Sequence, residues 1–185
     1  MSFEKISVIG AGYVGTSISV LLGQVKLNKK VTLVDSDGEK IAALKKLQSP
    51  IDDQLIQEYL SSKKSFIYPT TNLKECFGVT DLYILALPSN YDEKENYFDT
   101  RVIESVAKEI IKNDKNSKIL IRSTVPVGFT EKLKKLLKTK NIIFSPEFLR
   151  EDKALSDNLF PDRIVIGDQS EVGKEIGSLF SSSAS

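Results

Sequence analysis

The chain has 185 residues, enough for one domain with a sizeable buried core. Apolar residues make up 41% of it and charged residues 28%, and 26 basic against 25 acidic side chains leave a net charge of +1. This composition is typical of a globular protein. It argues against disorder, collagen-like repeats, a membrane-spanning run and a basic surface for nucleic acid.

Two residue types are absent or nearly absent, and this limits the chemistry. The chain has no histidine, which excludes Ser-His-Asp and Cys-His catalysis and histidine-bound zinc. A single cysteine excludes an intrachain disulfide and a cysteine-rich metal site, so no metal site is predicted. One cysteine and no pattern of a signal peptide favour a reducing compartment, and we expect a cytoplasmic protein.

Short β-branched apolar runs alternate with longer amphipathic stretches along the whole chain, which is typical of repeated β-α units. Strands are predicted near Lys5–Ile9, Val31–Asp35, Ser65–Tyr68, Leu82–Leu87, Lys118–Arg122, Asn141–Phe144 and Arg163–Ile166. Helices are predicted near Tyr13–Gly23, Gly38–Leu47, Asp52–Ser61, Thr100–Lys112, Thr130–Leu137, Glu151–Asn158 and Ser170–Phe180. The pattern predicts an α/β fold of Rossmann type, a doubly wound, mostly parallel sheet with helices on both faces.

The most informative local pattern is a glycine-rich turn between the first predicted strand and the first predicted helix. It reads Gly10-Ala11-Gly12-Tyr13-Val14-Gly15. The first glycine permits the tight turn, the second lets the backbone approach a pyrophosphate, and the third lets the helix pack against the sheet. A purely structural turn is the alternative, but the strand before it and the helix after it favour phosphate binding at the helix N-terminus.

An acidic residue follows at the end of the second predicted strand. A carboxylate at Asp35 can accept both hydrogen bonds of an adenosine ribose diol. It would repel the 2′-phosphate of NADP, and Ser36, Asp37 and Gly38 offer no arginine that would reverse this preference. The turn and the acid together predict a binding site for NAD.

Three further segments lie where predicted parallel strands end, which is the edge at which open α/β sheets bind their ligands. They read Ala86-Leu87-Pro88-Ser89-Asn90-Tyr91-Asp92, Ser123-Thr124-Val125-Pro126-Val127-Gly128 and Ser145-Pro146-Glu147-Phe148-Leu149-Arg150-Glu151. Together with the glycine turn they resemble the UDP-glucose/GDP-mannose dehydrogenase family. The resemblance extends over essentially the whole chain, including Ser49-Pro50-Ile51, Tyr97-Phe98-Asp99-Thr100 and Asp157–Arg163.

The resemblance implies an oxidoreductase that carries an alcohol of a nucleotide sugar through an aldehyde to an acid, with two molecules of NAD and a thioester on a cysteine. It places the cofactor on Gly10, Gly12, Tyr13, Val14, Gly15, Asp35, Lys40, Ser89, Thr124 and Glu151. It places the substrate, expected to be UDP-glucose, on Glu147, Phe148, Leu149, Arg150 and Glu151, partly through their backbone.

The catalytic residues that the resemblance implies within this chain are Thr124, Glu147 and Glu151. The two glutamates are four residues apart, so on a helical turn both carboxylates could face one cleft. With Thr124 they could hold and deprotonate the water that hydrolyses the thioester. The alternative is that Glu151 and Asp152 only provide capping charge at the start of the next helix.

The family's nucleophilic cysteine lies in a glycine-rich segment of a C-terminal domain. Cys76 matches no catalytic motif, and we expect it to be a partly buried apolar residue. We therefore expect residues 1–180 to form an NAD-binding domain, residues 181–185 to form a frayed polar tail, and the C-terminal catalytic domain to be absent, which leaves this chain inactive by itself. The expected parent protein is a homodimer, with this chain alone a monomer, and neither nucleic acid nor a membrane is an expected partner.

Two other functions stay open at this point. One is the cofactor domain of a different NAD-dependent enzyme, either a hydroxyacid dehydrogenase or a GDP-mannose-type dehydrogenase. The other is a non-enzymatic module that binds NAD as a sensor and would not need Glu147, Glu151 and Thr124. The chain has no histidine base for a hydroxyacid dehydrogenase, and it keeps all three residues that a sensor would not need.

Overall fold

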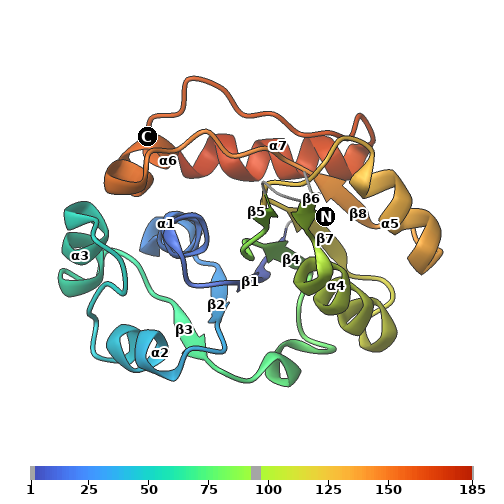
Figure 1. The fold of residues 1–185 in the computed structure, drawn as a ribbon. Coiled ribbons are helices and arrows are strands. Elements are labelled where there is room, and N and C mark those ends of the chain that lie inside the picture. The colour runs from blue at the N-terminus through green and yellow to red at the C-terminus, as the bar shows by residue number, and fades with distance from the viewer. Residues whose placement is uncertain (1–2, 93–96, 185) are drawn as a thin grey trace.

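The computed structural model describes residues 3–92 and 97–184 (Figure 1). Its centre is a six-stranded sheet in the order β3-β2-β1-β4-β7-β8, and every neighbouring pair is parallel. The strands of this sheet are β1 (Lys5–Ile9), β2 (Lys30–Val34), β3 (Tyr68–Thr70), β4 (Leu82–Leu85), β7 (Lys118–Ile121) and β8 (Ile142–Phe144). The strand order reverses beside β1, because β2 and β3 extend the sheet on one side of it and β4, β7 and β8 extend it on the other.

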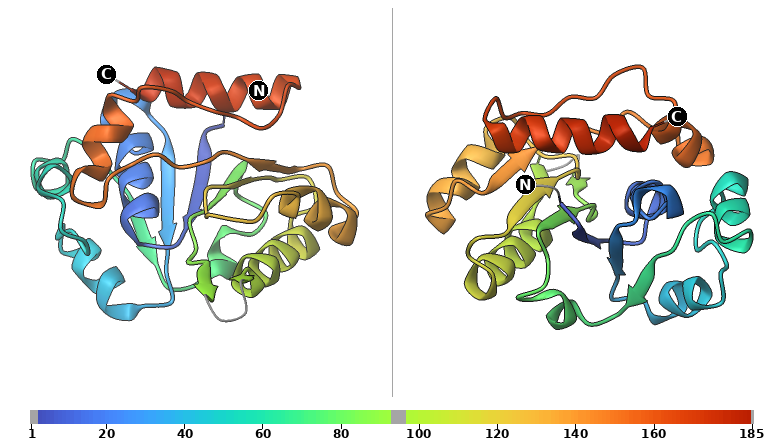
Figure 2. Two further views of the ribbon diagram at one scale, coloured as in Figure 1. Left: turned by 45° about the horizontal axis from the view of Figure 1, so that its top comes forward. Right: turned by 180° about the vertical axis from the view of Figure 1, so that it is seen from behind.

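Helices cover both faces of the sheet (Figures 1 and 2). One face packs against α1 (Tyr13–Leu22), α2 (Gly38–Lys45), α3 (Gln54–Ser61), α6 (Ala154–Leu159) and α7 (Glu171–Ser183). The other packs against α4 (Arg101–Asn113) and α5 (Phe129–Leu137). Along β4, Leu82 and Ile84 enter the first of these two cores while Tyr83 and Leu85 enter the second, as the alternation of side chains in a strand requires. The predicted Rossmann-type fold is confirmed.

Two predicted strands differ from the structure. The strand expected at 65–68 lies at Tyr68–Thr70, because Ser65 and Phe66 instead pair with the end of α1, where the N–H of Phe66 donates to the carbonyl oxygen of Gly23 (2.8 Å). Residues 163–166 form no strand. Beside β8 the N–H of Gly167 donates to Phe144, but the carbonyl oxygen of Val165 accepts from a serine side chain instead of a strand.

Two other elements also differ from the prediction. The helix expected at 151–158 begins as a 3-10 turn, η3 (Glu151–Lys153), before α6. A short antiparallel pair that was not predicted, β5 (Asn90–Asp92) with β6 (Tyr97–Asp99), follows β4. Two more 3-10 turns, η1 (Val25–Leu27) and η2 (Leu73–Cys76), lie in the connections.

The last helix extends further than predicted. α7 continues to Ser183, whose side chain is buried and donates to the carbonyl oxygen of Leu179 (2.7 Å). The carbonyl oxygen of Ser183 accepts from the buried side-chain amide of Gln24 (2.9 Å). The prediction of a frayed tail is therefore wrong for residues 181–183, because these hydrogen bonds and the burial of Ser183 fix the last turn of the helix. Ser185 lies outside the described residues.

Candidate functional site

In the glycine turn between β1 and α1, backbone atoms leave no room for a side chain at Gly10 or Gly15, whereas Gly12 has open space beside it. Gly10 has a φ of +108°, and a Cβ there would lie 2.3 Å from the carbonyl oxygen of Ala86. A Cβ at Gly15 would lie 1.7 Å from the carbonyl oxygen of Gly10. At Gly12, the N-cap of α1, a Cβ would meet no atom within 4 Å, and no side chain caps the helix. The space beside Gly12 is therefore open to a ligand.

Asp35 lies directly against this turn. Its Oδ2 accepts from the N–H of Ala11 (2.6 Å) and its Oδ1 accepts from the N–H of Asp37 (2.9 Å). Asp37 in turn caps α2 by accepting from the N–H groups of Glu39 and Lys40. The carboxylate of Asp35 is thus fixed at the end of β2, and each of its oxygens keeps a lone pair for a ribose hydroxyl.

One open pocket of about 610 Å³ connects these features at the carboxyl ends of the strands. It is lined by Gly10, Gly12, Tyr13, Val14, Asp35, Lys40, Ala86, Leu87, Pro88, Ser89, Arg122, Ser123, Thr124, Glu147, Leu149 and Glu151. Every residue predicted to bind the cofactor lines it except Gly15, which packs behind the turn. A sheet of this topology binds ligands at the same position, where the strand order reverses.

The predicted substrate residues divide between two cavities. Glu147, Leu149 and Glu151 line the pocket described above, whereas Phe148 and Arg150 line a neighbouring cavity of about 320 Å³. The two cavities share Arg122, Glu147 and Leu149 in their walls. The predicted substrate segment therefore separates the two cavities.

Glu147 and Glu151 do not lie on one helical turn as predicted. Residues 145–150 form neither helix nor strand, and Glu151 only begins η3. Both glutamates nevertheless line the same pocket, together with Thr124. Glu151 and Asp152 do lie in the first turn of η3, while the N–H of Leu155 at the start of α6 donates to the carboxylate of Asp53 (3.0 Å), so the capping alternative stays open.

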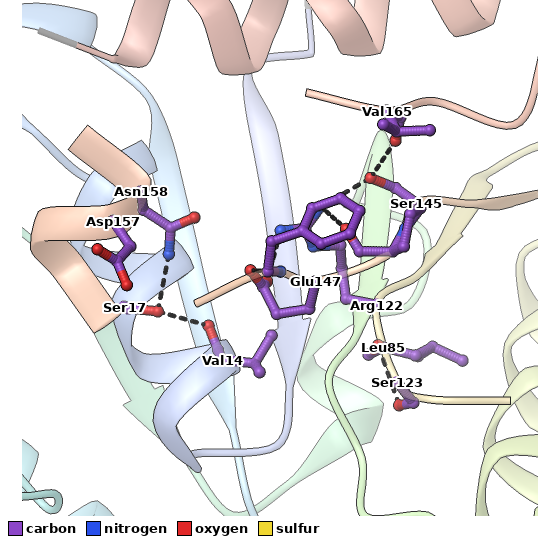
Figure 3. A network of polar contacts seen from close by, with 12 residues as sticks. Val14, Ser17, Leu85, Arg122, Ser123, Ser145, Glu147, Asp157, Asn158 and Val165 are labelled. Carbon is purple, nitrogen blue, oxygen red and sulfur yellow. Dashed lines mark hydrogen bonds and ion pairs between the residues drawn. The ribbon is translucent and has the colours of Figure 1, made fainter. Parts of the chain in front are cut away.

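Sequence reasoning missed Arg122, the residue after β7. Its guanidinium forms an ion pair with Glu147 (2.5 Å) and donates to the Oγ of Ser145 (2.7 Å) (Figure 3). Ser145 donates in turn to the carbonyl oxygen of Val165 (2.8 Å), so the ends of β7 and β8 and the 163–167 segment are linked. The sequence pattern that could have identified it is an arginine directly after a buried apolar strand and directly before Ser123 and Thr124.

Asp157 and Asn158, neighbours in α6, connect the segment with Arg150 to the first turn of α1. Asp157 holds Arg150, accepting from its backbone N–H (2.8 Å) and from its guanidinium (2.6 Å). The side-chain amide of Asn158 donates to the Oγ of Ser17 (2.9 Å), which donates to the carbonyl oxygen of Val14 in the first turn of α1 (Figure 3). The segment with Arg150 and the glycine turn are thus fixed to the same short helix.

Cys76 lies away from this site. It is 1% exposed and packs in the core between the sheet and α4, and burial raises the pKa of its thiol. Cys76 is thus an apolar core residue as predicted, but it is fully buried and not partly buried. Among the described residues no group of potential metal ligands is found, and the helices there are too short or too polar to cross a membrane.

A parallel sheet that reverses its strand order at a glycine turn, with a carboxylate after the second strand, defines a dinucleotide-binding domain of the dehydrogenase class. Residues 4–181 match the family model described as the UDP-glucose/GDP-mannose dehydrogenase family, NAD binding domain. The chain belongs to this family and is its NAD-binding domain.

Relatives and solved structures agree with this assignment. The chain is 44% identical to UDP-glucose 6-dehydrogenase of Campylobacter jejuni over 176 residues, and 39% identical to that of Streptococcus pneumoniae over 173 residues. These alignments cover 95% and 92% of this chain but 44% and 43% of the relatives, so the chain spans less than half of their length.

Among solved structures, a UDP-glucose dehydrogenase from Pyrobaculum islandicum has a TM-score of 0.83 and 25% identity, with 99% of this chain and 45% of that chain covered. A GDP-mannose dehydrogenase from Pseudomonas aeruginosa has a TM-score of 0.82 at 24% identity, with 97% and 44% covered, and shares the fold.

Proposed function

We propose that this chain is the NAD-binding half of a UDP-glucose 6-dehydrogenase, which oxidises UDP-glucose to UDP-glucuronate in two NAD-dependent steps. One observation carries the proposal: a single pocket is lined both by the glycine turn with Asp35 and by Thr124, Glu147 and Glu151. The names of the relatives with 39% to 44% identity support UDP-glucose over GDP-mannose as the substrate. A pure NAD sensor would need only the first group of residues.

The residues around the turn fit NAD. The open space at Gly12 receives the pyrophosphate, and the N–H groups that begin α1 face it. Asp35 accepts from the hydroxyls of the adenosine ribose, with Lys40 beside it in the pocket wall. Ser89 and Thr124 line the same pocket and would then hold the nicotinamide. NAD, when bound, supplies the hydride acceptor for the oxidation.

The chain's own residues at that end position the substrate and a water molecule. Phe148, Leu149 and Arg150 present backbone to the sugar, and Asp157 keeps Arg150 in place. Thr124, Glu147 and Glu151 line the same pocket, so a hydroxyl and two carboxylates would be available there to orient a water and accept its proton. A cytoplasmic location belongs to the same proposal, since a single buried cysteine suits a reducing compartment. A homodimer for the complete protein is proposed only from the resemblance to the family.

The test is an assay of NADH absorbance with the protein expressed from the complete gene. UDP-glucose should give sustained NADH formation with two NADH per UDP-glucuronate, and Glu147→Ala or Glu151→Ala should lower the rate by about 100-fold or more. Turnover of GDP-mannose in place of UDP-glucose would contradict the proposed substrate. NAD binding without oxidation of any nucleotide sugar would favour the sensor.

A further inference from the structure

Glu147 and Leu149 lie in the wall of the NAD pocket, within residues 146–150, which form neither helix nor strand. Side chains hold the backbone of this wall. Arg122 donates to the carbonyl oxygen of Pro146 (3.1 Å), and the carboxylate of Glu147 accepts from the N–H of Phe148 (2.9 Å). The shape of the wall therefore depends on the position of these two charged side chains.

Arg122 is enclosed on several sides. Its side chain is 7% exposed, it bonds to Ser145 and Glu147, and its guanidinium carbon lies 5.3 Å from the centre of the Phe180 ring. Its Nε is buried with no hydrogen-bond partner among the described residues, a cost that native proteins rarely accept without a functional reason. The planar guanidinium has one position here, and it fixes the Glu147 carboxylate through the ion pair.

The ion pair also decides the charge at this end of the pocket. The Glu147 side chain is 16% exposed, so water screens it only in part. The other charged side chains around the two cavities are Asp35, Lys40 and Glu151 in the NAD pocket, and Arg150, Asp157, Asp162 and Arg163 in the neighbouring cavity. Arg150 and Asp157 pair with each other, and Arg122 is the cation in direct contact with Glu147.

We propose that Arg122 is a positioning residue for the nicotinamide end of the pocket: it fixes the Glu147 carboxylate in the pocket wall and cancels its charge. This rests on the proposed function, in which the glycine turn and Asp35 orient the cofactor. The oxidised nicotinamide ring carries a positive charge and the reduced ring carries none. A neutral Arg122–Glu147 pair would not favour one charge state of the nicotinamide ring over the other. An unpaired Glu147 carboxylate would bind the positively charged, oxidised ring more tightly than the reduced ring.

The test compares the dissociation constants of NAD and NADH for this chain by calorimetry at neutral pH, where carboxylates are ordinarily ionised. In Arg122→Gln the ratio of the two constants should shift toward NAD by about threefold or more relative to the unchanged chain. Arg122→Gln with Glu147→Gln should return the ratio to that of the unchanged chain, and Arg122→Lys, which keeps the charge, should leave most of the original ratio.

A second variant covers the case in which Arg122→Gln does not fold. Glu147→Gln alone leaves the charge of Arg122 unbalanced, so it should shift the ratio of the two dissociation constants toward NADH by about threefold. The matched control is Lys134→Gln, which breaks an ion pair with Glu131 on the exposed side of α5 and should change nothing.

A ratio of the two dissociation constants that is unchanged in both Arg122→Gln and Glu147→Gln, in variants that bind NAD, would overturn the role of Arg122 and leave the proposed function standing. Failure of the unchanged chain to bind NAD would instead contradict the proposed function.

Discussion

Gly12 and Gly15 belong to the same turn, but the space around them differs. A substitution at Gly12 should therefore affect NAD binding, whereas one at Gly15 should affect folding. Gly12 has an extended backbone and open space, so Gly12→Val should fold and should weaken NAD binding by about tenfold or more, because the side chain occupies the pyrophosphate position. Gly15→Val places a side chain against the carbonyl oxygen of Gly10 and should lower the free energy of unfolding by about 3 kcal/mol or more.

Urea denaturation and calorimetry of the two variants measure this contrast. Normal NAD affinity in a folded Gly12→Val chain would rule out a phosphate role for the turn. Unfolding of Gly12→Val would mean that the glycine is required for the fold itself.

At the scale of elements, Asp53 joins two helices that are distant in sequence. Its Oδ1 caps α3 by accepting from the N–H groups of Leu55 and Ile56, and its Oδ2 accepts from the N–H of Leu155 in α6. The residue is 4% exposed, so Asp53→Ala leaves buried donors of both helices unpaired. We expect a loss of about 2–4 kcal/mol in the free energy of unfolding.

The matched control for this prediction is Asp37→Ala, which removes the exposed cap of one helix, α2, and should cost about 1 kcal/mol. Both values come from urea denaturation at neutral pH. Equal losses in the two variants would show that the bond from α6 to Asp53 contributes nothing to stability.

The Asp157–Arg150 pair makes the anchoring of residues 147–150, the proposed substrate segment, dependent on pH. Hydrogen bonds from the Arg150 side chain lower the pKa of Asp157 in the folded protein. A lowered pKa means that this contribution to stability is present above the unfolded-state pKa of about 3.9 and is lost as pH falls through the folded-state value. Urea denaturation from about pH 5 to pH 2 should show a fall in stability that is smaller in Asp157→Asn, and an identical fall in the variant would contradict this assignment.

The elements that were predictable are those in which local pattern and tertiary environment agree. β1, β2, β4 and β7 are buried apolar runs, and the glycine turn between β1 and α1 identifies the phosphate end. The β5–β6 pair was missed because its strands have three residues each, too few for a visible alternation.

Tertiary contacts decided the remaining differences between prediction and structure. Ser183 belongs to the fold because Gln24, far away in sequence, bonds to its carbonyl oxygen. Arg122 was missed for the same reason, since its partners Ser145 and Glu147 follow the next strand and only the sheet brings them together.

For the whole molecule, the position of Cys76 predicts what this chain does not do by itself. Formation of a thioester needs an accessible thiolate, but Cys76 is buried on the face of the sheet that packs against α4, with a raised thiol pKa, and does not line the pocket. The 185-residue chain should therefore bind NAD but form no UDP-glucuronate from UDP-glucose. Sustained NADH formation by the purified chain that is lost in Cys76→Ser would contradict this account.

The central claim is that the glycine turn and Asp35 form a site for NAD that rejects a 2′-phosphate. Calorimetric titration of this chain with NAD and with NADP, repeated for Asp35→Ala, tests it most directly. NAD should bind about tenfold or more tightly than NADP, because Asp35 accepts from the ribose diol and repels the phosphate, and Asp35→Ala should weaken NAD while it narrows the difference. Equal affinities of the unchanged chain for the two cofactors would contradict the claim.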